Sequence, residues 1–503
     1  MPETDDSQHD TRTFDVVVIG AGPVGENVAD RAGRRGLSVA VIESELVGGE
    51  CSYWACMPSK ALLRPGAVLA AARAVPGASS LLQTSPAPTA VDVAATLGRR
   101  DVFVSHWDDD GQVAWLDSTG ITLIRGRARF TGPRELVVTD DDGASTRVVA
   151  RHAVVVATGS DPVIPDIDGL AEAAPWTSRE ATSVQDIPAS LVILGGGVVA
   201  AEMAVAYADL GATVTVVVRG SRLLPRAEPF AALEVADGLD ALGVDVRFGT
   251  KAVAVRRAPD GVHVTLAGGG EILADEVLVA TGRAPRTADL GLEALGLEAG
   301  APLSVDDALQ VTAVEGGWLF AVGDVTGRTA TTHQGKYDAR VAGDVLAARF
   351  SASSGDGAGK AENETAAAAE RSAAPWSRYR ASADDAAVPQ VVFTRPEVAW
   401  VGQTERQARD AGIEVRVVQY ALGSVAGASL AADGYAGTAQ LVLDDARGVI
   451  VGATFTGPDA AELLHAATVA VVGEVPLDRL WHAVPAYPTV SEVWLRLLET
   501  AGL

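Results

Sequence analysis

The chain has 503 residues, of which 48% are hydrophobic, and a formal net charge of −25 at pH 7. Nucleic acid and anionic membrane surfaces repel so acidic a protein, so neither is expected as a partner. The length predicts about three domains. Two cysteines cannot build a disulfide framework, residues 1–12 lack a secretory signal, and no apolar run reaches the ~20 residues of a membrane span. We therefore expect a cytoplasmic protein.

A nucleotide-binding pattern lies near the N-terminus. Residues 14–19 are apolar and predict a buried strand, Gly20-Ala21-Gly22-Pro23-Val24-Gly25 follows, and a helix is predicted as far as Gly36. A second strand, 37–42, ends at Glu43. Glycines at this spacing let a pyrophosphate approach a helix N-terminus, and an acid at the strand end suits ribose hydroxyls. This region therefore predicts a dinucleotide site that uses Gly20, Gly22, Gly25 and Glu43.

The two cysteines of the chain lie in the next stretch, Gly48-Gly49-Glu50-Cys51-Ser52-Tyr53-Trp54-Ala55-Cys56-Met57-Pro58-Ser59-Lys60. Thiols five residues apart do not meet on a regular helix, but a helix that starts between them could bring them together, and Pro58 suits its first turn. Either they are two unrelated buried thiols or they form a redox-active disulfide. Beyond them we expect a helix over 61–74, a loop over 77–90 and a helix over 91–104.

The nucleotide-binding pattern recurs in the middle of the chain. A strand over 191–194 precedes Gly195-Gly196-Gly197-Val198-Val199-Ala200, and the strand after the following helix ends at Val218. Arg219 and Arg222 follow in place of an acid, which favours the 2′-phosphate of NADPH over NADH. The alternative is that these arginines only form a solvated basic turn.

Later in the chain, three further apolar strands end in short polar or glycine-containing motifs, and one segment is poor in large aliphatic residues. Apolar strands end at Ala157-Thr158-Gly159-Ser160, at Ala280-Thr281-Gly282-Arg283 and at Gly323-Asp324, and a helix is expected from Thr332-His333. Residues 350–387 are rich in Ala, Ser, Gly and Asp, which predicts a disordered insertion with Trp376 and Tyr379 as its only large anchors. Residues 389–503 resume as a folded α/β unit.

In combination these motifs resemble the flavoprotein pyridine nucleotide-disulfide oxidoreductases, the family of dihydrolipoamide dehydrogenase, glutathione reductase and mercuric reductase. The resemblance covers 14–349 and 389–501. It implies an α/β protein with two Rossmann-like dinucleotide-binding domains and a C-terminal α/β dimerisation domain. The implied domains are an FAD domain over 13–160 and 283–349, an NAD(P)H domain over 161–282, the insertion over 350–387 and a dimerisation domain over 388–503.

The same resemblance implies the roles of individual residues. Cys51 would be the interchange thiol of a Cys51–Cys56 disulfide and Cys56 the flavin-proximal one, with Lys60 near flavin N5 and Glu202 as the partner of that lysine. No metal ligands are implied. FAD would lie on Gly20, Gly22, Gly25, Glu43, Thr158, Gly159, Asp324, Thr332 and His333, and NADPH on Gly195, Gly197, Ala200, Arg219, Arg222, Gly282 and Arg283.

The sequence departs from the family at the C-terminal turn. The histidine that serves the interchange thiol is replaced by Tyr487, followed by Glu492, and both would act from the other subunit of a homodimer. No C-terminal cysteine pair of the mercuric reductase kind is present. Tyr53 and Trp54 are bulkier than the usual spacer residues, and we expect them to narrow access to the disulfide.

Three functions follow as hypotheses. The first is an oxidoreductase that passes hydride from NADPH through FAD to the Cys51–Cys56 disulfide and on to an unidentified small-molecule disulfide or other acceptor. The second is an NADPH:quinone reductase that works directly from the flavin. The third is a non-enzymatic flavoprotein sensor or scaffold.

Overall fold

The computed structural model describes residues 11–82, 91–351 and 374–503. These residues form two compact units, each assembled from three separate segments of the chain. The first unit contains the residues up to Tyr53 together with Val104–Asp161 and Arg283–Asp384, and the second contains Trp54–Phe103, Pro162–Gly282 and Asp385–Leu503. Both units combine helices with sheets, which confirms the predicted α/β class.

The first unit is built on a sheet whose strand order is β3-β2-β1-β6-β5-β4, with β16 also paired to β6. Strands β1, β2, β3 and β16 run parallel to the strand they pair with, and the β4–β5 hairpin continues the sheet in antiparallel fashion. Val16–Ile19 of β1 and Ala153–Val156 of β6 are adjacent in register and fully or almost fully buried. Continuous apolar runs of this kind are typical of parallel strands covered on both faces. The strands are β1 (Thr11–Ile19), β2 (Val39–Glu43), β3 (Thr122–Arg125), β4 (Arg127–Gly132), β5 (Glu135–Thr139), β6 (Ser145–Val156) and β16 (Leu319–Ala321).

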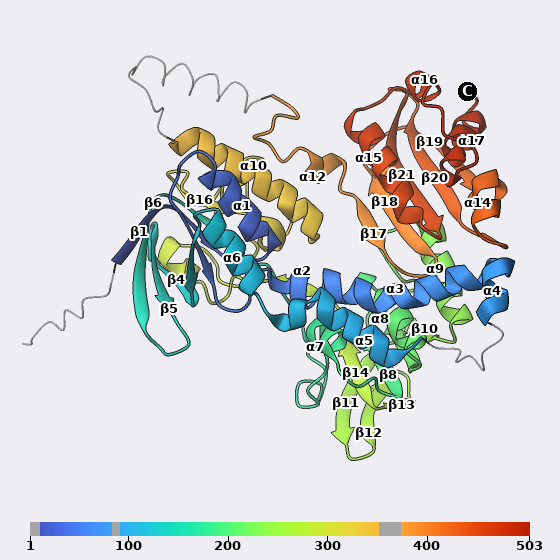
Figure 1. Cartoon of the computed structure of the whole chain (residues 1–503), viewed down its shortest axis with the longest axis horizontal. Coiled ribbons are helices and arrows are strands. Elements are labelled where there is room, and N and C mark those ends of the chain that lie inside the picture. The colour runs from blue at the N-terminus through green and yellow to red at the C-terminus, as the bar shows by residue number, and fades with distance from the viewer. Residues whose placement is uncertain (1–10, 83–90, 352–373) are drawn as a thin grey trace, which may run out of the picture. The chain divides into compact units, whose positions relative to one another are not determined.

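Two helices from opposite ends of this unit's sequence lie side by side, α1 (Pro23–Gly33) and α10 (Thr332–Phe350) (Figure 1). Arg31 of α1 donates to Asp344 of α10 over 2.6 Å, and Gly343 lets the two backbones approach closely. The later segment Arg283–Asp384 thereby completes a unit that the first fifty residues begin. The remaining short elements are α2 (Gly49–Tyr53), η1 (Ser105–Trp107), α6 (Asp110–Ser118), η2 (Leu292–Leu295), η3 (Gly323–Thr326) and β15 (Arg283–Pro285), which pairs with β7 (Ser160–Pro162).

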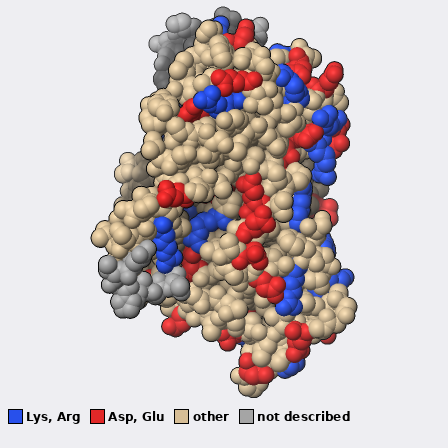
Figure 2. Space-filling view, turned by 90° about the vertical axis from the view of Figure 1, so that its right-hand side faces the viewer, with Lys and Arg blue, Asp and Glu red and all other residues tan. Residues whose placement is uncertain are grey.

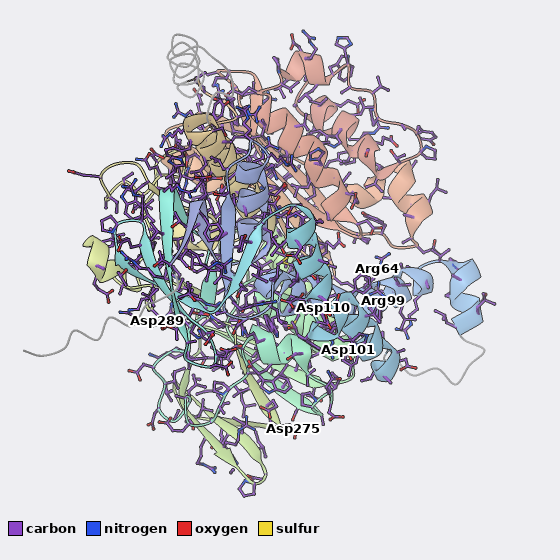
Figure 3. All side chains as sticks on the ribbon, turned by 60° about the vertical axis from the view of Figure 1, so that its left-hand side comes forward. Arg64, Arg99, Asp101, Asp110, Asp275 and Asp289 are labelled. Atoms are coloured by element: carbon purple, nitrogen blue, oxygen red, sulfur yellow. The ribbon has the colours of Figure 1, made fainter. Side chains whose placement is uncertain are left out.

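The second unit holds a parallel sheet of order β10-β9-β8-β14 and an antiparallel sheet β11-β12-β13. Asp275, labelled in Figure 3, joins β14 to β8 by accepting from the backbone N–H of Ser190 over 2.8 Å. The elements are α7 (Ser178–Ser183), β8 (Ser190–Leu194), α8 (Val198–Asp209), β9 (Thr213–Val218), α9 (Pro229–Ala241), β10 (Asp245–Phe248), β11 (Ala252–Ala258), β12 (Gly261–Leu266), β13 (Glu271–Ala274) and β14 (Glu276–Val279).

The C-terminal part of this unit is a five-stranded antiparallel sheet of order β17-β18-β21-β20-β19. Its strands are β17 (Gln390–Val392), β18 (Glu397–Gly402), β19 (Val415–Ala421), β20 (Thr438–Asp444) and β21 (Val449–Gly457). Its helical elements are α12 (Ala383–Ala386), which spans the unit boundary, α13 (Glu405–Asp410), η4 (Leu422–Ser424), α14 (Ala426–Ala431), η5 (Ala460–Leu463), α15 (Leu464–Val472), α16 (Leu477–Leu480), η6 (Val490–Glu492) and α17 (Val493–Thr500). The unit also contains α3 (Cys56–Arg73), α4 (Pro76–Leu82) and α5 (Val93–Phe103), so residues 76–82 are a helix where we expected a loop.

The predicted insertion also differs from the structure where the structure describes it. Phe350 still belongs to α10, residues 352–373 lie outside the described part, and residues 374–384, here called the strap, pack against the first unit. Arg378 donates to Asp344 over 2.7 Å, Arg380 pairs with Asp307, and Ala381 is 1% exposed. Ion pairs, the buried Ala381 and the half-buried ring of Tyr379, which packs on the core of the unit, hold the strap.

The strap brings a second carboxyl group to a buried one on α10. Asp338 is fully buried, and Asp384 accepts from Gln334 over 2.6 Å and lies 3.2 Å from the guanidinium of Arg328. Burial and then the neighbouring Asp384 carboxylate raise the pKa of Asp338 well above the usual aspartate range. The folded protein therefore holds a proton that the unfolded chain releases.

The surface in Figure 2 carries acidic and basic side chains interspersed among uncharged ones. Among the described residues, no helix is both long and apolar enough to cross a bilayer.

We expect Asp338→Asn to flatten the fall in stability with rising pH. In the wild type, raising the pH above about 4 favours the unfolded chain by up to about 1.4 kcal/mol per pH unit, because only the unfolded Asp338 loses its proton there. The asparagine variant lacks this pH-dependent contribution to stability. Thermal unfolding midpoints between pH 5 and 8 measure the contribution, and Asp117→Asn, at an exposed position, is the control. Parallel pH curves for Asp338→Asn and the wild type would contradict the assignment.

Candidate active site

The first glycine turn joins β1 to α1. Gly20 has φ +99°, and a Cβ there would lie 2.5 Å from the carbonyl oxygen of Ala157, while a Cβ on Gly25 would lie 1.9 Å from the carbonyl oxygen of Gly20. At Gly22 the nearest atom would be 4.0 Å away, on Gly49. Gly20 and Gly25 are therefore required by backbone packing, and Gly22 keeps open space at the start of α1.

Glu43 is fixed beside this turn. One carboxylate oxygen accepts from the N–H of Ala21 over 2.7 Å, and the other accepts from the N–H of Glu45 over 2.8 Å. Each oxygen keeps a further lone pair for a hydroxyl. Glu26, on the first turn of α1, was not foreseen, and burial raises its pKa to about 7. A partly protonated acid so close to the turn repels a diphosphate less than a full carboxylate.

A polar network in the same unit links Asp324, expected to bind the flavin, with Arg283, which we expected to bind NADPH. Ser160 donates to Asp324 over 2.6 Å and accepts from Arg283 over 2.8 Å. Arg283 and Arg286 lie 3.9 and 3.7 Å from the carboxylate of Glu50, the residue before Cys51. Thr158, on the far side of Gly159, donates to the carbonyl of Arg286 over 2.6 Å. The structure therefore brings Thr158, Asp324 and Arg283 together, with Ser160 as a link that the sequence analysis missed.

Helix α10 begins at two of the residues expected to bind FAD. Thr332 is its first residue and the exposed His333 its second. The hydroxyl oxygen of the capping residue, Thr331, is buried and bonds to no group among the described residues. An open glycine turn, a fixed acid and a helix start with an unused buried hydroxyl fit the FAD assignment.

The second glycine turn, between β8 and α8, repeats the first. Gly195 has φ +137°, and a Cβ there would lie 2.2 Å from the carbonyl oxygen of Ala280, whereas a Cβ on Gly197 would meet nothing within 4 Å. Ala200 is fully buried under the turn, and Gly282 leaves similar open space. At the end of β9, Arg219 is exposed, and Arg222 donates to the carbonyl of Pro225 over 2.8 Å. Arg222 therefore uses one of its five N–H donors within its own turn.

The cysteine stretch continues directly into a long helix. Cys51 lies on α2, Cys56 is the first residue of the 18-residue α3, and both are partly buried. Lys60 follows Cys56 by one helical turn and forms an ion pair with Glu202 of α8 over 2.7 Å. The carboxylate of Glu202 is almost completely buried and also accepts from the N–H of Phe393 over 3.0 Å. The expected Lys60–Glu202 pair is thus present.

The C-terminal turn places its two expected residues differently. Tyr487 is 76% exposed, precedes a cis peptide bond to Pro488 and makes no hydrogen bond to another described residue. Glu492 is 7% exposed and accepts from Arg496 over 2.6 Å, while its other carboxylate oxygen is buried without a partner in the described part of the protein. Within one protomer, therefore, nothing described here engages the phenol of Tyr487.

The sequence pattern of the pyridine nucleotide-disulphide oxidoreductases matches residues 14–339, and the pattern of their dimerisation domain matches residues 388–497. The chain belongs to this family. Members are FAD-dependent oxidoreductases that use NAD(P)H, and the dimerisation domain supports a homodimer. Both the predicted family and the predicted architecture are confirmed.

Curated relatives span almost the whole chain. The dihydrolipoyl dehydrogenase of Thermus scotoductus is 34% identical over 97% of this chain and 97% of its own length. The mercuric reductase of Acidithiobacillus ferrooxidans is 32% identical over 97% of this chain and 82% of its own length. Among solved structures, the HOCl-induced flavoprotein disulfide reductase RclA of Escherichia coli, as its Cu(II) complex, has a TM-score of 0.79 at 25% identity and covers 97% of this chain and 99% of that one.

We expect Arg219→Ala to raise KM for NADPH by roughly tenfold and to leave KM for NADH nearly unchanged. A charge-assisted hydrogen bond to phosphate contributes about 1.5–3 kcal/mol, and NADH lacks the phosphate. Steady-state kinetics with both nucleotides measure the effect. Gly197→Ala is the matched comparison, because a methyl in the open turn should weaken both nucleotides equally. Equal losses in Arg219→Ala would contradict the phosphate assignment.

Proposed function

We propose that this flavoprotein is an NADPH-dependent reductase in which the Cys51–Cys56 pair holds two electrons before an acceptor takes them. The observation that carries the proposal is the placement of Cys56 at the start of α3, one turn before the Lys60–Glu202 ion pair. A helix N-terminus favours a negatively charged thiolate, which is the reactive form of cysteine. When bound, FAD would supply hydride transfer from the nicotinamide and two-electron transfer to the disulfide.

The protein residues have distinct roles in this proposal. Gly20, Gly22, Gly25 and Glu43 would hold the FAD dinucleotide, Asp324 its ribityl chain, and the start of α10 the pyrimidine end. Lys60 would lie near the flavin as a fixed positive charge, because the buried Glu202 holds its ammonium group in place. Residues 161–282 would bind NADPH, with Arg219 on the 2′-phosphate, and we place the enzyme in the cytoplasm.

Reduction of an external disulfide then follows ordinary thiol exchange. The Cys51 thiol releases its proton to water and attacks one sulfur of the substrate as a thiolate, and the other sulfur leaves and takes a proton. The Cys56 thiolate then displaces the first sulfur, which also takes a proton, and the Cys51–Cys56 bond is restored. The substrate gains two electrons and two protons in total. Tyr487 of the partner subunit would donate the proton to the leaving thiolate.

Tyr487 also favours the second candidate function, direct reduction of a quinone-like acceptor. A free tyrosine has a pKa of about 10 and histidine one of about 6.5, so a tyrosine is a weak base at neutral pH. It can protonate a leaving thiolate but poorly deprotonates the attacking thiol. Disulfide exchange would be slow, whereas transfer straight to a quinone needs no such base.

Replacing both cysteines by serine should separate the two functions. We expect the double variant to lose NADPH oxidation with disulfide acceptors and to keep oxidation with quinones within about twofold, because only the first route uses the thiols. A panel of disulfides and quinones, run with equal flavin loading, makes the measurement. Loss of both activities would make the thiols obligatory for every acceptor, and no NADPH oxidation by the wild type would favour the non-enzymatic role.

Tyr487→His should raise disulfide turnover by about tenfold, less than the ~10²–10⁴-fold of full general acid–base catalysis because the tyrosine can already donate a proton. The reason is that histidine can both accept and donate the proton near neutral pH. Tyr487→Phe is the matched control, since it keeps the ring and removes the hydroxyl. If the wild type turns over a common low-molecular-weight disulfide faster than it turns over quinones, and Tyr487→His slows that turnover, then tyrosine is the working acid and base.

A further inference from the structure

The two aromatic residues between the cysteines are anchored within the protein. Tyr53 belongs to the first unit, lies two residues after Cys51 on α2 and is fully buried. Its hydroxyl donates to the carbonyl of Val47 over 3.0 Å and lies 3.3 Å from that of Asp108. The expectation that Tyr53 narrows access to the thiols is therefore wrong, because the ring packs inside the unit.

Trp54 is held in the second unit, to which Cys56 also belongs. Its backbone carbonyl lies 3.0 Å from the hydroxyl of Thr182, which shares its one proton with the carbonyl of Ser178 at 2.9 Å. Its indole ring lies under the guanidinium of Arg179, 4.3 Å from the ring centroid. Both contacts come from α7, so one short helix holds the backbone and the side chain of Trp54. A cation over an indole ring contributes about 0.5–2 kcal/mol, depending on how far it is desolvated.

Helix α7 is itself firmly fixed, which a six-residue helix needs if it is to hold another segment. A capping box between Thr177 and Glu180 closes its N-terminus. Arg100 of α5 is completely buried and donates to the carbonyls of Thr182 and Val184, and Tyr207 of α8 donates to that of Ala181 over 2.7 Å. The last carbonyls of α7 are thus satisfied by two side chains from neighbouring helices.

We propose that Trp54, clamped by Arg179 and Thr182, is a positioning residue that fixes the chain just before Cys56. This role rests on the disulfide relay proposed above. Only Ala55 separates Trp54 from Cys56, so the position of the Trp54 carbonyl determines where α3 can begin.

The clamp acts on a defined chemical step. Two electrons and one proton convert the Cys51–Cys56 bond to a Cys56 thiolate and a Cys51 thiol, and exchange with substrate later re-forms the bond. If the chain before Cys56 can shift, the thiolate loses its fixed position and the bond re-forms more slowly. Direct transfer from flavin to a quinone does not involve this segment and should be unaffected.

The test compares Arg179→Gln and Trp54→Leu with Arg179→Lys, which keeps the cation. The control is Arg99→Gln, because Arg99, labelled in Figure 3, makes an equivalent contact with Phe103 of α5, 4.4 Å from its ring centroid. Three quantities are measured on the holoenzyme. The first is the long-wavelength charge-transfer absorbance of the thiolate with the flavin after two-electron reduction. The others are the rate of Cys56 alkylation and the ratio of turnover with a disulfide to turnover with a quinone.

We expect Arg179→Gln and Trp54→Leu to weaken the absorbance, to change the alkylation rate and to lower the disulfide-to-quinone ratio about fivefold, on the scale of one cation–π contact. Arg179→Lys should restore most of the loss, and Arg99→Gln should behave as wild type. Variants that match Arg99→Gln in all three measurements would overturn the clamp, as would an equal fall in both turnovers. If the wild type lacks this thiolate–flavin absorbance and the double-serine variant keeps all activity, the disulfide relay is wrong, and the positioning role of Trp54 is wrong with it.

Discussion

In each unit a glycine approaches the end of a neighbouring strand so closely that no side chain would fit there. A Cβ at position 20 would lie 2.5 Å from the carbonyl oxygen of Ala157, and a Cβ at position 195 would lie 2.2 Å from the carbonyl oxygen of Ala280. In both cases the turn can pass from strand to helix only because the residue has no side chain and tolerates a positive φ. The open positions Gly22 and Gly197 follow from this geometry, since each turn lifts the next residues away from the strand ends. The two nucleotide-binding turns thus share one physical solution at widely separated places in the chain.

Glu202 plays a comparable part in the second unit. A carboxylate with so little exposure needs compensating partners, because desolvation of an unpaired charge costs several kcal/mol. Its partners come from α3 and from the chain after β17, so three segments far apart in sequence meet at one side chain. Lys60 also lies 4.9 Å from the ring centroid of Phe393, which restricts the ammonium further. The fixed charge near Cys56 is therefore a consequence of how this unit is assembled.

The sequence was sufficient for features whose signal is local. Both glycine turns, the buried strands beside them and the helix after Cys56 are encoded within some thirty residues each, and family resemblance supplied the Lys60–Glu202 pair. Ser160 was visible at its strand end, but its links to Asp324 and Arg283 join residues 164 and 123 positions away and leave no periodic pattern. The strap was misjudged because ion pairs such as Arg378–Asp344 hold it and composition suggests a coreless segment. Trp54 was judged by its size, whereas its contacts with α7 decide its role.

Asp344 of α10 forms ion pairs with two arginines from different parts of the chain. One carboxylate accepts from Arg31 and from Arg378, so α1, α10 and the strap are tied at a single point. Ser351 still donates to the carbonyl of Ala347, and the strap is secured independently by Asp307. Loss of the Asp344 carboxylate would therefore release α1, α10 and the strap from one another at once, whereas loss of Arg378 would leave the strap still held through Asp307.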